Sequence, residues 1–239
     1  MSKVDLRLDW CSYEAAKFAV EHWHYSKTMP VNKTVKIGVW ENKSYIGCVV
    51  YSCGSAGVGS ISKSFGLENT HVAELARVAL NNHISSVTKI VSISLKMLKK
   101  EQEGLRLIVS YADPFRGHIG SIYQAGNWYY VGRSSADKAY IDVSGKRWHS
   151  RSVSESGYKV HCGIKTRCPK PSQMTEVDVI PKYKYLFPLD DAMRKQIEPL
   201  RKPYPKRERG ETDNAPQSNA ETEGASPIRS LLEVNNGTP

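Results

Sequence analysis

The strongest constraint on the fold is an apolar segment at residues 105–111 that follows a helical pattern. Residues 105–111 are an almost unbroken apolar run, typical of a central strand buried on both faces. Before it, residues 86–100 carry Ser86 as a helix cap, Gly104 as a stop, and one buried stripe. The stripe is formed by Val87, Ile90, Val91, Met97 and Leu98. A helix leading into a buried strand is the building unit of α/β proteins.

The rest of the chain repeats this alternation of helices and strands. Ser12 is a good helix cap, and apolar residues then recur at helical spacing up to Trp23. The pattern predicts, in order, a helix at 12–24, paired strands at 36–40 and 45–52, a flexible glycine-rich loop at 54–59, a strand at 72–80, a short helix at 117–125, and strands at 128–131 and 140–143. We therefore expect an α/β fold with a mixed central sheet covered by helices on both faces.

The domain organisation follows from composition along the chain. Residues 1–190 are expected to form one catalytic domain, in which residues 133–190 either add a basic subdomain or complete the sheet. Residues 199–239 are rich in Pro, Glu, Asn, Ser and Gly, which predicts a disordered basic and polar tail. No run approaches the roughly 18 apolar residues that span a bilayer. The sequence thus predicts a cytoplasmic protein without a membrane partner.

The charge of the chain points to a polyanionic partner. Its net charge is +10 and its pI about 9.3, which favours encounter with nucleic acid. A basic C-terminal extension between residues 145 and 170 contains a single acid, Glu155. The candidate DNA contacts in it are Lys146, Arg147, Arg151, Lys159, Lys165 and Arg167. The alternative is a solvated basic surface with no partner. The five cysteines are scattered and form no C-x-x-C pair, which disfavours a structural zinc site.

Asp113 is the first candidate catalytic residue. It comes directly after the buried strand, before Pro114 and a glycine-bearing turn. Ligands in open α/β sheets gather outside the carboxyl ends of strands, so a carboxylate there is placed to act as a general base. The alternative, equally supported, is that Asp113 only caps the turn.

His24 and Tyr25 are candidates because they stand where the first helix ends. Together with Asp113, His22 and His24 would supply the two-histidine, one-carboxylate set that binds iron. Residues two apart on a helix point about 200° from each other, so the two histidines share a metal only if the helix has already unwound. The alternative is simple packing of Trp23 and Tyr25, with His22 in solvent.

Arg77 and His118 are candidate binding residues. Arg77 is a lone charge in an apolar strand and should meet an anion, because an unpaired buried charge costs several kcal/mol. In a regular strand Glu74 would lie on the opposite face, which favours a ligand contact. His118 is a second candidate acid or base, although it can equally cap a helix or face solvent. Aromatic residues can also stack on a base lifted from a duplex: Trp23, Tyr25, Trp128, Tyr129 and Tyr130.

Several motifs resemble a known family. The segment Ser121–Trp128 resembles the helix-to-strand signature of the GNAT acyltransferases. More narrowly, several segments resemble motifs of the phage Mom proteins: HYS at 24–26, LARVAL at 75–80, YADP at 111–114, GHIGSIYQAGNWYYVG at 117–132 and KYKYLFPLD at 182–190. The resemblance implies a GNAT-like fold and an enzyme that adds a carbamoylmethyl group to the exocyclic N6 of adenine in double-stranded DNA, protecting it from restriction.

The resemblance also implies roles for individual residues. His24, Tyr25 and Asp113 would form the reaction centre and would hold iron if the family requires it. Arg77 would bind donor or substrate. GNAT enzymes hold the pyrophosphate of coenzyme A on a glycine-rich loop, but here the equivalent stretch, residues 81–86, has no glycine. Ser85 and Ser86 can still bind a phosphate at the following helix.

The donor therefore stays open at this point. It is an activated acyl or glycyl-type molecule, with acetyl-CoA as one candidate, although a carbamoylmethyl group is joined through a methylene carbon that direct acetyl transfer does not supply. Two other functions compete with DNA modification. One is an ordinary N-acetyltransferase acting on a small amine or protein, and the other is a non-catalytic DNA-binding protein.

Overall fold

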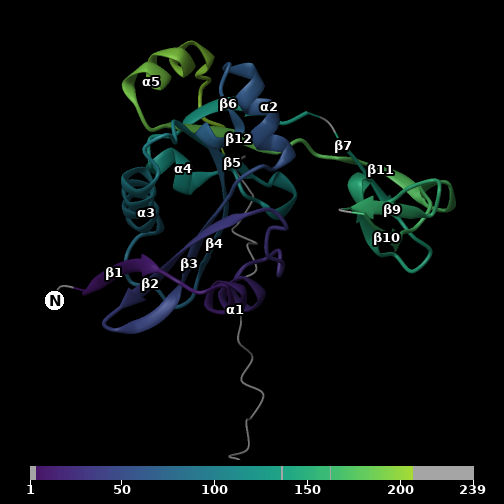
Figure 1. Ribbon diagram of the computed structural model, residues 1–239, viewed down its shortest axis with the longest axis horizontal. Helices are drawn as coiled ribbons and strands as arrows, with labels where there is room; N and C mark the ends of the chain where they lie inside the picture. Colours follow the sequence, from purple (N-terminus) through teal and green to yellow (C-terminus); the bar gives the residue numbers. More distant parts are fainter. Residues whose placement is uncertain (1–3, 136, 162, 207–239) are drawn as a thin grey trace, which may run out of the picture.

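A computed structural model describes residues 4–135, 137–161 and 163–206 and is built on a seven-stranded mixed sheet (Figure 1). The strand order is β1-β2-β3-β4-β5-β12-β6, with β4 and β5 parallel and the other neighbours antiparallel. The bounds are β1 Leu6–Trp10, β2 Thr34–Glu41, β3 Ser44–Ser52, β4 Val72–Leu80, β5 Leu107–Ala112, β6 Tyr129–Arg133 and β12 Tyr183–Pro188. The predicted mixed sheet and its central strand at residues 105–111 are confirmed.

Helices cover both faces of the sheet, as predicted. On one face lie α1 (Tyr13–Trp23), α2 (Ala56–Ser64) and α5 (Asp191–Ile197), which pack on residues such as Cys48, Val50, Leu107 and Val109. On the other lie α3 (Val87–Glu101) and α4 (Ser121–Ala125). Short 3₁₀ helices join these elements: η1 Asn69–His71, η2 Pro114–Arg116, η3 Ser150–Ser152, η4 Pro171–Gln173 and η5 Glu198–Leu200. Within the described residues, no helix has the length and apolar character to cross a membrane.

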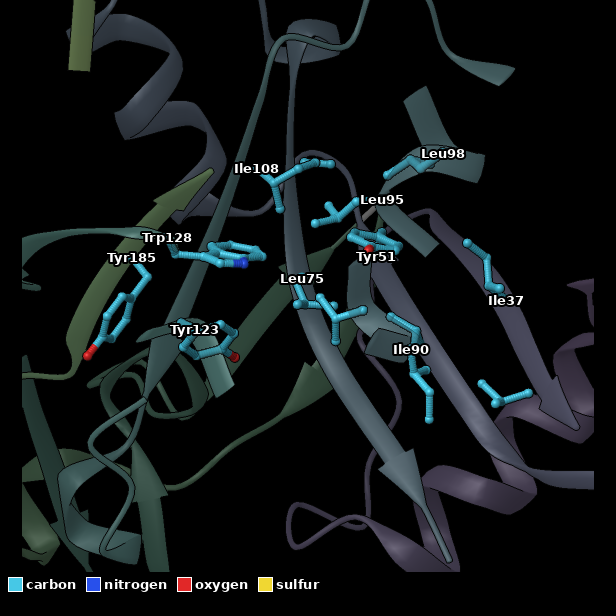
Figure 2. Close-up of a cluster of buried hydrophobic side chains, with 14 of the residues drawn as sticks. Ile37, Tyr51, Leu75, Ile90, Leu95, Leu98, Ile108, Tyr123, Trp128 and Tyr185 are labelled. Atoms are coloured by element: carbon cyan, nitrogen blue, oxygen red, sulfur yellow. The ribbon is translucent and has the colours of Figure 1, made fainter. Parts of the chain in front are cut away.

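The main core lies under α3 and α4. Figure 2 shows Leu95 and Leu98 of α3 in one cluster with the sheet residues Tyr51 and Ile108, with an aromatic group at one end of the cluster. In that group the Tyr123 ring lies 5.0 Å from Trp128 and 5.1 Å from Tyr185. Trp128, Tyr129 and Tyr130 are all buried in the body of the protein. The expectation that these three stack on a DNA base is therefore wrong, because their rings build the core.

Two predicted elements differ from the structure. The glycine-rich segment predicted as a loop forms α2, because Ser55 caps it and Val58 and Ile61 bury their side chains under it. The short helix predicted to start at residue 117 starts at Ser121. Gly117 and Gly120 have φ of +70° and +83°, which a right-handed helix excludes.

A small lobe projects from the main sheet (Figure 1), and we call residues 137–179 the basic lobe. It contains a three-stranded sheet of β7 (Asp137–Ile141), β8 (Arg147–His149) and β11 (Thr175–Val179). Beside it, β9 (Tyr158–His161) pairs with β10 (Ile164–Arg167). The chain then returns as β12 between β5 and β6, so residues 133–190 both add a lobe and complete the sheet.

The domain also continues beyond residue 190. Met193 and Ile197 of α5 are fully buried, the Lys202 amide donates to Tyr130 O at 2.8 Å, and the Tyr204 hydroxyl donates to Trp128 O at 2.8 Å. Residues 199–206 of the predicted tail are thus fixed along the sheet by backbone acceptors. The remainder of that tail, residues 207–239, lies outside the described residues.

Candidate active site

A cavity of about 470 Å³ lies where β4 and β5 separate. The two strands pair only from Val72–Glu74 to Leu107–Val109, and the cavity opens between the segments that follow. Residues 75–78 of β4 line one side and residues 111–113 line the other, while the end of α1 and residues 117–123 complete the walls. This is the carboxyl end of two adjacent parallel strands, where α/β folds place their ligands. The predicted residues His24, Tyr25, Arg77, Asp113 and His118 all line it.

His24 is held as a neutral imidazole. Its Nδ1 accepts a hydrogen bond from the Ser26 amide at 3.1 Å and lies 2.8 Å from the Ser26 hydroxyl. Because a backbone amide only donates, Nδ1 is unprotonated and Nε2 carries the hydrogen. Burial, reinforced by the positive charge of Arg77, lowers the pKa of His24 to about 3. The side chain therefore serves as an uncharged N–H donor at neutral pH and not as a general base.

Tyr25 stacks beside His24 at the mouth of the cavity. Its ring centroid lies 4.3 Å from that of His24 and 5.4 Å from that of His118. The Arg116 guanidinium lies 5.9 Å from the same ring. Burial of the hydroxyl and the nearby Asp113 carboxylate raise the pKa of Tyr25, so the phenol stays protonated. An exposed ring with a protonated hydroxyl can both stack on a planar ligand and donate a hydrogen bond.

Asp113 lies at the end of β5, in the wall of the cavity. Its Oδ1 accepts from the Phe115 amide at 3.0 Å and so caps η2, while the residue also lines the cavity. Its Oδ2 lies 3.8 Å from the Nζ cation of Lys182, the residue just before β12. The carboxylate is thus fixed in orientation at the end of β5, with Oδ1 on the Phe115 amide and Oδ2 facing the Lys182 ammonium. It is the acceptor best placed to take a proton from a ligand in the cavity.

A β-bulge decides where Arg77 points. The register of β3 with β4 shifts so that Val50 pairs with Arg77 and Tyr51 with Leu75, leaving Ala76 as the extra residue. Glu74 and Arg77 therefore lie on the same face, contrary to the expectation for a regular strand. Glu74 accepts from the Ser55 hydroxyl at 2.7 Å, and no carboxylate lies within 4 Å of Arg77 among the described residues.

The Arg77 side chain is anchored by backbone carbonyls. Its Nε donates to Thr28 O at 3.1 Å and its Nη1 to Ala76 O at 2.7 Å. Burial lowers the pKa of Arg77, although the guanidinium stays charged at neutral pH. Its other N–H groups meet no acceptor in the described part of the chain, which leaves them for an anionic or carbonyl group of a ligand.

The residues expected to hold iron do not fit that metal. The Nδ1 lone pair of His24 is used by Ser26, and its Nε2 carries a hydrogen, so neither ring nitrogen is open for coordination. His22 is exposed on α1 and its Nδ1 pairs with Phe18 O. Among the described residues no cluster of three His, Cys, Asp or Glu side chains is spaced to bind a metal ion.

Ser85 and Ser86, predicted to bind donor phosphate, do not line the cavity. The Ser86 hydroxyl accepts from the Lys89 amide as the cap of α3. The amides of Ile84 and Ser85 donate to the two carboxylate oxygens of Glu41, at 2.8 and 2.7 Å. Glu41 is buried at the end of β2 and supplies an internal anion where a phosphate was expected. Only His83 and Val87 of this segment reach the cavity wall.

The sequence alone missed Glu41, Lys182 and Arg116. Glu41 lies at the end of β2, and its carboxylate reaches residues more than 40 positions away, which no local pattern reports. Lys182 lies just before β12, far along the chain from Asp113. Arg116 carried a signal, because it lies in the turn that begins with Asp113 and Pro114.

The basic lobe holds the six predicted DNA contacts, and most of them are exposed. Lys146 lies 4.1 Å from the ring of Trp148, and Lys165 lies 4.4 Å from that of Tyr158. Lys159 is partly used, because its ammonium donates to the Arg151 carbonyl. Several acids of the lobe have partners within it: Asp142 accepts from Ser144 and Trp148, Glu155 accepts from Ser172, and Glu176 pairs with Lys138.

The lobe reaches the mouth of the cavity through one contact. The Arg147 guanidinium of β8 lies 5.0 Å from the ring of Phe115, two residues after Asp113. A polyanion bound to the lobe can therefore extend across the cavity entrance. This geometry suits a long, negatively charged substrate better than a small amine.

Comparison with known proteins gives the family. The model of the Mom protein family matches residues 5–206. The chain belongs to the Mom family. A relative in Escherichia phage Mu, "Methylcarbamoylase mom", is 22% identical over 207 residues, which cover 84% of each chain. The family match at residues 5–206 spans β4, β5 and the basic lobe.

Two solved acetyltransferases were also found among similar structures. An IAA acetyltransferase from Bacillus cereus is 12% identical, with a TM-score of 0.42, over 77% of this Mom-family chain and 100% of its own. The spermidine/spermine N-acetyltransferase SpeG from Vibrio cholerae is 10% identical, with a TM-score of 0.41, over 80% of this chain and 96% of its own.

Proposed function

We propose that the chain is a DNA modification enzyme that transfers a carbamoylmethyl group to the exocyclic N6 of adenine in double-stranded DNA. Membership of the Mom family makes it a transferase. The observation that carries the proposal is the joining of two features: a cavity lined by Asp113, His24, Tyr25 and Arg77, and a basic lobe that meets its mouth at Phe115. Protection from restriction enzymes is the consequence expected for modified DNA.

The adenine amine is a poor nucleophile because its lone pair is delocalised into the ring. As N6 attacks the methylene carbon of the donor, an N–C bond forms and the bond from that carbon to its leaving group breaks. The leaving group departs with the electron pair. N6 becomes cationic, and Asp113 accepts its proton.

The other cavity residues stabilise the charge that develops. The N–H at Nε2 of His24 and the protonated hydroxyl of Tyr25 are donors for the carbamoyl oxygen or the leaving group. The unused N–H groups of Arg77 supply a positive charge for the same purpose. His118, close to Tyr25, can return a proton to the leaving group.

Reaction at N6 requires the base to leave the duplex. In double-stranded DNA the amine lies within the stack, out of reach of a carboxylate that lines a cavity. A cavity of about 470 Å³ has the size of a small-molecule site and accepts one lifted base beside a donor group. Tyr25 is the ring on which that base would stack. The lobe cations Arg147, Arg151, Lys165 and Arg167 would hold the phosphates on either side, with smaller contributions from Lys146 and Lys159.

The donor is an activated small molecule that presents an electrophilic carbon. A donor of the acyl-CoA type remains within this class, but its pyrophosphate would not be held on the Ile84 and Ser85 amides, because Glu41 occupies them. The carboxylate would also repel a phosphate placed there. Arg77 is then the principal site for a negative or carbonyl group of the donor.

Mass spectrometry of nucleosides tests the function directly. DNA from cells expressing the chain should contain deoxyadenosine heavier by one carbamoylmethyl group, and DNA from cells expressing Asp113→Asn should contain about 10²–10⁴-fold less. Equal thermal unfolding of the two proteins is the control. Unmodified adenine in cells with soluble wild-type protein would refute the proposal.

The same experiment separates the competing functions. An adenine heavier by an acetyl group would indicate an N-acetyltransferase. Unmodified DNA that nevertheless binds the purified chain would indicate a non-catalytic DNA-binding protein.

A further inference from the structure

Phe115 is an apolar ring held out at the rim of the cavity. Its side chain is 60% exposed, although most large apolar residues of the main body are buried. It lies in η2, one turn of 3₁₀ helix fixed by Pro114 and by the Asp113 cap. Asp113, Gly117 and His118 line the cavity, whereas Phe115 and Arg116 between them do not. The short helix therefore directs Asp113 inward and leaves Phe115 on the outer surface.

Two cations flank the Phe115 ring. The Arg116 guanidinium lies 5.7 Å from it, and the Arg147 guanidinium of the basic lobe lies 5.0 Å from it. Arg116 also approaches Tyr25, the ring at the cavity mouth, at 5.9 Å. The exposed ring is thus centred between the cavity and the lobe. Phosphates bound by the two arginines would place a duplex directly over Phe115.

We propose that Phe115 is the wedge that enters the base stack when the target adenine is lifted into the cavity. This rests on the proposed DNA modification. Removing a base from the stack leaves a gap between its neighbours and an unpaired partner base, and apolar side chains stabilise such gaps by filling them. A planar ring does so by stacking on the bases that remain. Phe115 is two residues from the carboxylate that would accept the adenine proton, so wedge and reaction site move as one unit.

Phe115 acts here as a positioning residue, and its loss should affect duplex DNA selectively. Single-stranded DNA has no stack to open, so the ring contributes little to its modification. Phe115→Ala should therefore reduce modification of a duplex by about tenfold or more relative to the same strand alone. Phe115→Trp, which keeps a planar apolar ring, should retain most of the duplex activity.

The test uses the full chain and a target adenine first located in the DNA of cells expressing wild type. An oligonucleotide centred on that adenine is incubated, as duplex and as single strand, with purified protein in bacterial extract that supplies the donor. In parallel, the target is replaced by 2-aminopurine, whose fluorescence rises when it leaves the stack. Tyr13→Ala, an exposed aromatic at the opposite end of α1, is the matched control.

The expected results are a duplex-specific loss of modification and a smaller fluorescence rise with Phe115→Ala, with Phe115→Trp and Tyr13→Ala close to wild type. Equal losses on duplex and single strand, or an unchanged fluorescence rise, would overturn the wedge. Absence of any modified adenine with wild type would instead refute the proposed function, so the two failures are distinguishable.

Discussion

The backbone amide of Ser85 donates a 2.7 Å hydrogen bond to Oε1 of Glu41, across 44 positions of sequence. The Ile84 amide binds the other carboxylate oxygen, so both oxygens hold the loop that leads into α3. Burial by itself would raise the pKa of Glu41, but the amide hydrogen bonds outweigh it and lower the pKa. A negative charge near the start of α3 also interacts favourably with the positive end of the helix dipole.

Glu41→Gln should therefore destabilise the protein at neutral pH. Gln keeps the size of the side chain but offers one acceptor for two amides, which predicts a loss of about 1–3 kcal/mol in the free energy of unfolding. Because the folded-state pKa of Glu41 is depressed, its contribution is present above the unfolded value of about 4.3 and is lost as the pH falls through the folded-state pKa. Urea unfolding should show a gap between variant and wild type that narrows below pH 4. Glu21→Gln, an exposed acid on α1, is the control, and a pH-independent gap would contradict the prediction.

Because folding lowers the pKa of His24, protonation of this residue should destabilise the folded protein at acidic pH. A histidine in a salt bridge, whose pKa is raised, has the opposite effect. The folded-state pKa of His24, about 3, lies below the unfolded value of 6.5, so the unfolded chain takes up the proton first. Stability is then lost as the pH falls from about 6.5 toward 3, at up to about 1.4 kcal/mol per pH unit. His24→Asn keeps an acceptor for the Ser26 amide and removes the titration. Its stability should change less between pH 6.5 and 5 than that of wild type, and parallel curves would disprove the assignment.

Arg77→Lys should reduce modification of DNA by about 10²-fold while the protein stays folded. A lysine keeps the charge but cannot hold Thr28 O and also offer a planar pair of N–H groups to a ligand. Quantifying modified deoxyadenosine from expressing cells measures the effect. Lys89→Arg replaces one cation by another on α3, outside the cavity lining, and should leave the yield at the wild-type level. Full activity of Arg77→Lys would show that charge alone suffices there.

Binding to DNA should depend on salt through the basic lobe. The logarithm of the binding constant falls linearly with the logarithm of salt concentration, with a slope of roughly 0.9 per phosphate contact. Replacing both Lys165 and Arg167 by Ala should reduce the magnitude of that slope by about 2. The control is Lys195→Ala on α5, away from the lobe (Figure 1). An unchanged slope in the double variant would mean that DNA lies elsewhere.

Local sequence determined much of the secondary structure. Ser12 and Ser86 cap α1 and α3 at the predicted positions, because a cap depends only on residues three positions away. The run at residues 105–111 is the central strand β5 because only burial on both faces accommodates it. The strand at 72–80 and the hairpin of β2 and β3 follow from similar short-range patterns. α2 escaped prediction because its glycines suggested a loop, while the apolar partners of Val58 and Ile61 come from distant strands.

The candidate site divides in the same way. The sequence by itself singled out His24, Tyr25, Arg77, Asp113 and His118, through their positions at element ends or within an apolar strand. Only the tertiary structure placed them around one cavity, since that depends on the separation of β4 from β5. It also fixed the protonation of His24, the face of Arg77 and the internal anion at Ser85. These rest on a Ser26 contact, a single bulge residue and a carboxylate brought from β2, and each is a spatial relation that spacing along the chain does not encode.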